Sequence, residues 1–338
     1  MKEAMLYEKA GKERVRCLLC AHRCVIKEGE RGICAVRENR NGTLYSLVFG
    51  KAVTLDIDPI EKKPFFHFLP ASLSYSVATV GCNFTCLNCQ NYYISQYPRE
   101  YEGRIIGIDT SPLEIVAEAK ARGCKTIAYT YSEPTIFFEY AYDTARLAHE
   151  EGLKNVFVSN GYMTAAATEI IGPYLDGICI DLKGISEKFY REISGGNLGP
   201  VLDTIRLMHS MGVWVEIVTL IIPGVNDSAE EMRWTAEAIK GISESIPWHV
   251  SRFYPAYRMT DHLPTPIETI QQARQIGFEV GLRYVYEGNI PGQGETTRCP
   301  TCSELLIERI GFLVKENHLR AGRCPACNEE IEGVWLNP

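Results

Sequence analysis

The chain has 338 residues, of which 46% are hydrophobic and 23% charged, and its formal net charge is −7 at pH 7. This composition is typical of globular proteins and excludes fibrous and intrinsically disordered chains. The acidic balance argues against a nucleic-acid-binding or anionic-membrane surface. Residues 1–17 lack the apolar core of a signal peptide, so we expect a cytoplasmic protein with no membrane partner.

Residues 1–73 are predicted to form a cysteine-rich amino-terminal extension with short strands near 43–49 and 52–57. Four of the thirteen cysteines of the chain lie here with His22 among them, in the pattern Cys17-x2-Cys20-x3-Cys24-x9-Cys34. Disulfides are rare in a reducing compartment, so this cysteine spacing indicates a metal site. We expect zinc, which would tie down a segment with little core, and a second [4Fe-4S] cluster acting as an electron relay is the alternative.

Residues 74–290 alternate short apolar runs with amphipathic helical ones, which predicts repeated βα units on a parallel sheet. Helices are expected to begin at Pro112 and after Ser228, where capping boxes stand, and to cover 135–151. Six or seven units fit a (β/α) barrel or an open doubly wound sheet, and periodicity does not separate these. The expected strands are 74–80, 125–131, 155–160, 177–183, 214–222, 248–254 and, as a further one, 284–288.

Residues 291–338 are predicted to form a small appended domain after the linker 291–294. Its two C-x2-C knuckles, Cys299 with Cys302 and Cys324 with Cys327, are separated by 21 residues, which is the spacing of a zinc ribbon. We therefore expect Zn²⁺ there, and rubredoxin-like iron is the alternative.

Cys82, Cys86 and Cys89 follow the first core strand directly, where the active-site loops of parallel α/β folds lie. Three closely spaced thiolates can hold three irons of a [4Fe-4S] cube and leave the fourth iron open to a substrate or cofactor. A zinc knuckle completed by a distant ligand is the alternative. The remaining two cysteines, Cys124 and Cys179, lie in apolar runs and are expected to be buried structural thiols.

The pattern C-x3-C-x2-C after a first strand resembles the radical S-adenosylmethionine (SAM) enzymes. The resemblance implies a partial (β/α)6-type barrel in which Cys82, Cys86 and Cys89 ligate a [4Fe-4S] cluster. In that family SAM chelates the open iron. One electron from a reductant such as flavodoxin or ferredoxin cleaves SAM, and the resulting 5′-deoxyadenosyl radical abstracts a hydrogen atom from the substrate.

Further segments at the strand ends are similar to SAM-binding motifs of that family. Ser132 and Glu133 stand where relatives carry a Gly-Gly-Glu-Pro motif that binds the amino group of SAM, although Glu133 could equally cap the next helix. Ser159 and Asn160 resemble the ribose-contacting turn. The segment 222–227 resembles the loop that meets adenine.

Asp181-Leu-Lys183 resembles the Asp-Leu-Lys of glycyl-radical activating enzymes. Positions i and i+2 of a strand share a face, so both charged groups could reach the ribose and the carboxylate of SAM at the barrel mouth. A structural ion pair is the alternative. Residues His249, Arg252 and Tyr254 on the sixth strand are weaker candidates for substrate contact.

The whole chain resembles the AmmeMemoRadiSam-system radical SAM enzymes, which are related to the pyruvate formate-lyase activating enzyme. The resemblance implies hydrogen abstraction from an unidentified substrate, with Memo-like and AMMECR-type proteins as partners. One alternative function is activation of a glycyl-radical enzyme, and another is a non-catalytic iron-sulfur and zinc protein for electron transfer or as a scaffold.

Overall fold

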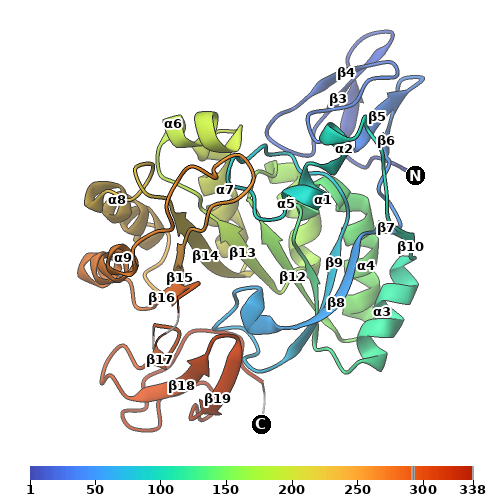
Figure 1. The fold of residues 1–338 in the computed structure, drawn as a ribbon. Coiled ribbons are helices and arrows are strands. Elements are labelled where there is room, and N and C mark those ends of the chain that lie inside the picture. The colour runs from blue at the N-terminus through green and yellow to red at the C-terminus, as the bar shows by residue number, and fades with distance from the viewer. Residues whose placement is uncertain (291, 293, 337–338) are drawn as a thin grey trace.

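The computed structural model describes residues 1–290, 292 and 294–336. Within this part of the chain the central sheet has eight strands in the order β16-β15-β14-β13-β12-β11-β9-β8, and all are parallel except β8, which runs antiparallel to β9 at one edge. Neither edge strand pairs with the other, so the sheet is an open barrel (Figure 1). The strands are β8 Thr54–Pro59, β9 Leu73–Ala78, β11 Thr126–Tyr129, β12 Lys154–Ser159, β13 Gly177–Asp181, β14 Trp214–Ile221, β15 Trp248–Arg252 and β16 Val285–Gly288.

The helices between the parallel strands lie on the outer face of the sheet (Figure 1). They are α3 Pro112–Ala121, α4 Phe138–Glu150, α5 Ala165–Ile171, α7 Leu198–Ser210, α8 Ala229–Lys240 and α9 Ile267–Val280. The predicted start at Pro112 is confirmed, because Ser111 and Glu114 form a reciprocal capping box. The third predicted helix instead begins as a short 3-10 turn, η2 Pro134–Phe137, before α4.

Shorter elements fill the connections between these strands and helices. They are β7 Lys51–Ala52, β10 Ile108–Asp109, η1 Ile60–Lys62, α1 Tyr92–Ser95, α2 Tyr97–Glu100, η3 Gly172–Tyr174, α6 Glu187–Phe189 and the π-turn η4 Tyr190–Ser194. None of the helices in the described part of the chain has the length and apolarity that a bilayer-spanning segment needs.

The amino-terminal region packs directly on the barrel. Its two small sheets comprise β1 Lys2–Glu3, β2 Tyr7–Lys9, β3 Arg14–Cys17, β4 Val25–Lys27, β5 Arg37–Arg40 and β6 Thr43–Ser46. Their buried side chains, such as Val15, Ile26 and Leu44, belong to the same apolar cluster as Ile127 and Ile180 of the barrel strands. The central sheet begins with β8, inside the segment 1–73 that the sequence assigned to the extension, because pairing of β8 with β9 is long-range and leaves no local signal.

The carboxyl-terminal region forms a three-stranded antiparallel sheet of β17 Thr297–Arg298, β18 Leu305–Ile310 and β19 Leu313–Asn317. Its core is a separate, small cluster in which Leu306, Ile307 and Ile331 meet Phe66 and Tyr286 of the barrel. Two residues of the predicted linker, 291 and 293, lie outside the described residues.

Candidate active site

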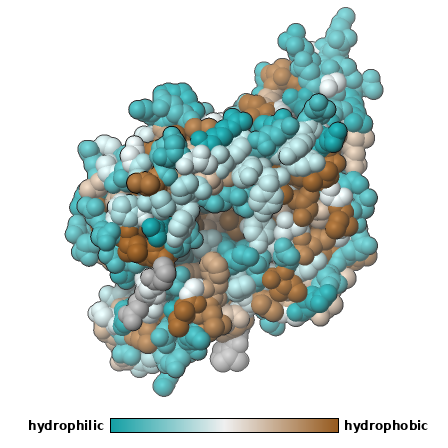
Figure 2. All heavy atoms as spheres, viewed as in Figure 1, coloured by the Kyte–Doolittle hydropathy of each residue, from teal (hydrophilic) through white to brown (hydrophobic). Residues whose placement is uncertain are grey.

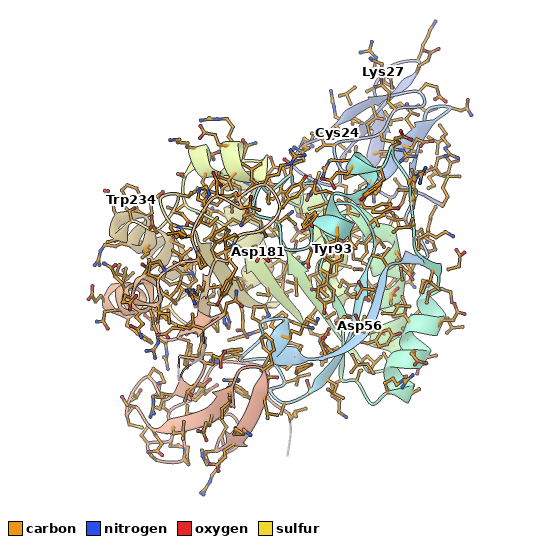
Figure 3. The ribbon with its side chains drawn as sticks, in the orientation of Figure 1. Cys24, Lys27, Asp56, Tyr93, Asp181 and Trp234 are labelled. Carbon is orange, nitrogen blue, oxygen red and sulfur yellow. The ribbon has the colours of Figure 1, made fainter. Side chains whose placement is uncertain are left out.

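A cavity of about 910 Å³ opens at the carboxyl ends of the parallel strands. All the core-site residues that the sequence singles out line this cavity, namely Cys82, Cys86, Cys89, Ser132, Glu133, Ser159, Asn160, Asp181 and Lys183. Figure 2 shows the hollow at the centre of this face, and Figure 3 shows Asp181 at its middle. The volume lies in the range of about 300–1,000 Å³ that ligand sites occupy.

The loop that carries the three thiols is held from both sides. Gly81 begins it with φ +100°, and a Cβ there would lie 2.6 Å from Val36 Cγ1, so glycine is required. The backbone N–H of Thr85 donates to the carbonyl of Ser194 at 2.9 Å. Burial raises the pKa of Cys82 well above its ordinary value, and the charge of Glu133 raises it further. The loop is therefore held in place, and Cys82 is shielded from water.

The spacing of these thiols distinguishes a cluster from a single ion. Among the described residues, the sulfur atoms of Cys82, Cys86 and Cys89 do not gather within 4.8 Å of one another, whereas the four carboxyl-terminal cysteine sulfurs do. In a [4Fe-4S] cube each thiolate binds a different iron, so its thiolates stand farther apart than those around one ion. The loop therefore lacks the close-set sulfurs that the carboxyl-terminal thiols present to a single ion.

Glu133 connects two neighbouring strand ends. Its Oε1 accepts hydrogen bonds from the Ser159 hydroxyl at 2.8 Å and from the Thr135 backbone N–H at 3.0 Å, while its Oε2 accepts the backbone N–H of Asn160 at 2.8 Å. The capping role is therefore real, and it leaves Oε2 with a lone pair for a further donor. Burial raises the pKa of Glu133 although these hydrogen bonds lower it.

Two residues next to Glu133 show how this sequence replaces the glycines of the family motif. Tyr131 adopts φ 64°, a left-handed conformation, and its hydroxyl donates to Asp58 Oδ2 at 2.6 Å and accepts from Lys63 Nζ at 3.1 Å. These contacts fix the Tyr131 side chain, which itself lines the cavity. The hydroxyl of Ser132 is buried and has no hydrogen-bond partner within the structure, so it is available to a ligand.

Asp181 and Lys183 meet at the cavity wall as the strand periodicity predicts. The Nζ of Lys183 lies 2.7 Å from Asp181 Oδ2. Burial lowers the pKa of Lys183, but the negative charges of Asp181 and of the Cys86 thiolate together raise it above its ordinary value. The two side chains thus form an ion pair at the cavity wall, and the Lys183 ammonium keeps its charge near neutral pH.

The three candidate residues on the sixth predicted strand differ in whether they line the cavity and are free to contact a ligand. His249 lines the cavity but is buried, with Nε2 2.7 Å from Glu216 Oε2, so it is a satisfied structural residue. Tyr254 also lines the cavity, whereas Arg252 donates to the Thr265 carbonyl at 2.6 Å and is absent from the lining.

Sequence reasoning noted Asn88 only as a departure from the aromatic residue of the family, not as a candidate polar contact, yet it lines the cavity. Asn88, between the second and third thiols, has a buried Oδ1 without a partner in the structure. The signal that could have found it is its place inside the cysteine loop.

The two terminal cysteine groups differ in geometry. At the carboxyl terminus, sulfur atoms lie 3.6 Å apart for Cys299 and Cys327 and 3.7 Å apart for Cys302 and Cys324. Four ligands at about 2.3 Å around a tetrahedral ion would stand about 3.8 Å apart, so these thiols fit a single metal ion. No three sulfurs of the described amino-terminal cysteines, Cys17, Cys20, Cys24 and Cys34, come within 4.8 Å of one another.

An open parallel barrel with a cysteine loop at its first strand end defines a class of metal-dependent α/β enzymes. Residues 76–235 match the family model of the Radical SAM superfamily. The chain is 27% identical over 167 residues to the pyruvate formate-lyase-activating enzyme of Clostridium pasteurianum, which covers 48% of this chain and 70% of that protein. The chain belongs to the radical SAM superfamily and is a radical SAM enzyme.

Two further comparisons extend the likeness. An uncharacterised protein of Methanocaldococcus jannaschii is 45% identical over 338 residues, covering 99% of this chain and 100% of that protein. SuiB of Streptococcus suis, solved with S-adenosylmethionine bound, superposes with a TM-score of 0.51 at 13% identity, over 68% of this chain and 53% of that one, which shows the shared fold. Membership implies a [4Fe-4S] cluster and SAM and sets aside the non-catalytic alternative.

Proposed function

We propose that Cys82, Cys86 and Cys89 hold a [4Fe-4S] cluster at which SAM is reductively cleaved, and that the enzyme abstracts a hydrogen atom from a substrate bound in the same cavity. The observation that carries the proposal is that the three thiols and the six polar side chains of the SAM-like motifs line one cavity. When bound, the cluster and SAM would together supply a 5′-deoxyadenosyl radical able to take a hydrogen atom from the substrate.

The polar residues of the cavity orient the cofactor. Glu133 Oε2 has capacity for the amino group of SAM, and the unpartnered hydroxyl of Ser132 lies beside it. The Asp181–Lys183 pair offers a carboxylate for ribose hydroxyls and an ammonium for the SAM carboxylate. These contacts would hold the sulfonium over the open iron and keep water out of the reaction.

The test is SAM cleavage by the reconstituted full-length protein under anaerobic conditions. With dithionite and SAM, the protein should release 5′-deoxyadenosine, and Cys86→Ala should abolish this release. The matched control is Cys124→Ala, because Cys124 is equally buried but lies outside the cavity lining. Equal release by Cys86→Ala and the parent protein would refute the assignment.

A second candidate function is activation of a glycyl-radical enzyme. It is favoured by the identity to a pyruvate formate-lyase-activating enzyme and by the Asp181-Leu-Lys183 segment. An electron paramagnetic resonance doublet of a glycyl radical on a co-expressed partner protein would support it. A radical product confined to a small molecule would contradict it.

We further propose that the carboxyl-terminal thiols bind Zn²⁺. The sulfur separations of 3.6 and 3.7 Å support a single tetrahedral ion. Elemental analysis should find one zinc per chain, and a chain with iron alone would contradict the zinc assignment.

Interaction with partner proteins of the Memo-like and AMMECR-type families stays a prediction from the resemblance.

A further inference from the structure

A buried positive charge lies near two of the amino-terminal cysteines, Cys17 and Cys34. The side chain of Arg37 is only 2% exposed, and its Nη2 pairs with the carboxylate of Glu139, which is fully buried. Its Nε and Nη1 have no hydrogen-bond partner within the structure. Burial lowers the pKa of Arg37, while the charges of Glu139, Cys17 and Cys34 raise it. Neutral thiols would leave these donors unsatisfied, so the arrangement indicates an anionic group between the cysteines and Arg37.

The spacing of the thiols indicates which anionic group this is. Like the cysteine loop of the radical SAM core, and unlike the carboxyl-terminal thiols, the described amino-terminal cysteines have no three sulfurs within 4.8 Å of one another. The amino-terminal site can therefore be compared with two other sites in the same chain, the core loop proposed to hold a cluster and the carboxyl-terminal thiols proposed to hold a single ion. The sequence alone favoured zinc at this site, and the observed geometry reverses that preference.

We propose that Cys17, Cys20, Cys24 and Cys34 bind a second [4Fe-4S] cluster. Arg37 faces this cluster and satisfies its two free donors on the cluster sulfides or the thiolates. His22 is not a ligand through Nε2, because that atom donates to the carbonyl of Asn83 at 2.8 Å.

Short connections join this site to the radical SAM loop. Arg99 donates from Nε to the Ile33 carbonyl at 3.1 Å and from Nη2 to the Cys82 carbonyl at 2.7 Å. The carbonyl of Cys34 lies 3.1 Å from where a Cβ of Gly81 would stand. Each of these contacts links a residue at or beside one cysteine group to a residue at or beside the other.

Because the two sites are connected, we assign the second cluster the role of an electron relay, and this role rests on the proposed function. A low-potential one-electron donor of the flavodoxin or ferredoxin class reduces the amino-terminal cluster, which passes the electron to the cluster on Cys82, Cys86 and Cys89. No bond forms or breaks, and the donor is oxidised by one electron for each SAM cleaved. Cys20 and Cys24 are the two cysteines of this group that are only partly buried, and Figure 3 shows Cys24 where the amino-terminal region meets the core, so we expect a donor to approach on this side.

Metal and sulfide analysis of anaerobically purified full-length protein tests the cluster. We expect about eight irons and one zinc per chain, since each cube holds about four irons. Cys20→Ser/Cys24→Ser should keep about four irons, and so should the triple variant Cys82→Ala/Cys86→Ala/Cys89→Ala. Parent protein with about four irons, whether with one zinc or two, would overturn the proposal.

The relay is tested separately by changing the electron donor. Cys20→Ser/Cys24→Ser should lose SAM cleavage driven by reduced flavodoxin and keep cleavage driven by dithionite, a small reductant that reaches the core cluster directly. Equal loss or equal retention with both donors would overturn the relay. If the parent protein fails with dithionite as well, the proposed function itself has failed, while the iron count still decides the second cluster.

Discussion

The two ends of the chain each carry four cysteines, yet their surroundings differ in a way that explains what each set does. The carboxyl-terminal region has only a small core of its own, and its thiols stand at the separation of a single ion. The amino-terminal region shares the large core of the barrel, and two of its thiols, Cys17 and Cys34, lie near buried Arg37. A region without sufficient core needs a structural ion, whereas a region already folded by apolar packing is free to use its thiols for redox chemistry.

The largest expected effect comes from removing the ion where the core is small. Cys302→Ser/Cys327→Ser should lose zinc and unfold β17–β19, because a structural zinc contributes on the order of 10 kcal/mol. Hydrogen–deuterium exchange should become fast there. The matched variant Cys20→Ser/Cys24→Ser should lose iron while exchange in β2–β4 stays slow. Fast exchange at both ends of the chain would contradict the proposed difference between a structural ion at the carboxyl terminus and a site supported by apolar packing at the amino terminus.

A second prediction concerns the buried charge pair. Arg37→Met should lower the free energy of unfolding by about 3–5 kcal/mol, because it leaves the buried Glu139 carboxylate uncompensated. Arg37→Met/Glu139→Leu should recover most of that loss. Arg37→Met should make the reduction potential of the amino-terminal cluster more negative, as followed by electron paramagnetic resonance titration. An unchanged potential in Arg37→Met would mean that Arg37 is only structural.

The third prediction uses pH to weaken contacts between the barrel and the carboxyl-terminal region. Burial lowers the pKa of His67 to about 4, and its ring bonds the Glu332 carbonyl at 2.7 Å and the Tyr286 hydroxyl at 2.6 Å. Between pH 6.5 and 4 the unfolded state takes up a proton that the folded state does not, so stability falls as the pH falls. From pH 7.5 to 5.5 this loss is about 1.4 kcal/mol.

Chemical denaturation of the parent protein and of His67→Gln at both pH values measures the effect. The His67→Gln variant should lose most of the pH dependence assigned to this ring. An identical pH slope in the two proteins would show that another group is responsible.

The smallest expected effect belongs to His22. His22→Phe removes one hydrogen bond to the Asn83 carbonyl and keeps an aromatic ring against Tyr162, so it should cost about 1 kcal/mol. The iron content should not change. Loss of iron in His22→Phe would instead identify the imidazole as a ligand, and the amino-terminal site would then be a mixed one.

Much of the barrel could be predicted because its signals are local. The strands from 74 to 288 show runs of buried residues, and the capping box at Ser111 marks a helix start without reference to anything distant. The candidate SAM contacts were also found, because parallel strands bring their carboxyl ends to one edge and so collect Glu133, Asn160 and Lys183 into one cavity.

What could not be predicted depends on contacts between distant residues. The pairing of β8 with β9, the Tyr131–Asp58 hydrogen bond across 73 positions and the placement of Arg37 beside Glu139 across 102 positions are decided by the folded chain. The spacing of four cysteines along the sequence likewise does not reveal how far apart their sulfur atoms will lie in the folded chain. The metal that each site favours is therefore a property of the tertiary structure.

The open edge of the barrel has a consequence for how the cell could control this enzyme. The sheet ends at β16 without closing, and Ile310, Gly311 and Phe312 of the carboxyl-terminal region complete the wall of the cavity. In the proposed enzyme, zinc supply would govern which molecules fit beside the radical, and iron supply would govern whether a radical forms. Two nutrients would thus set selectivity and reactivity independently.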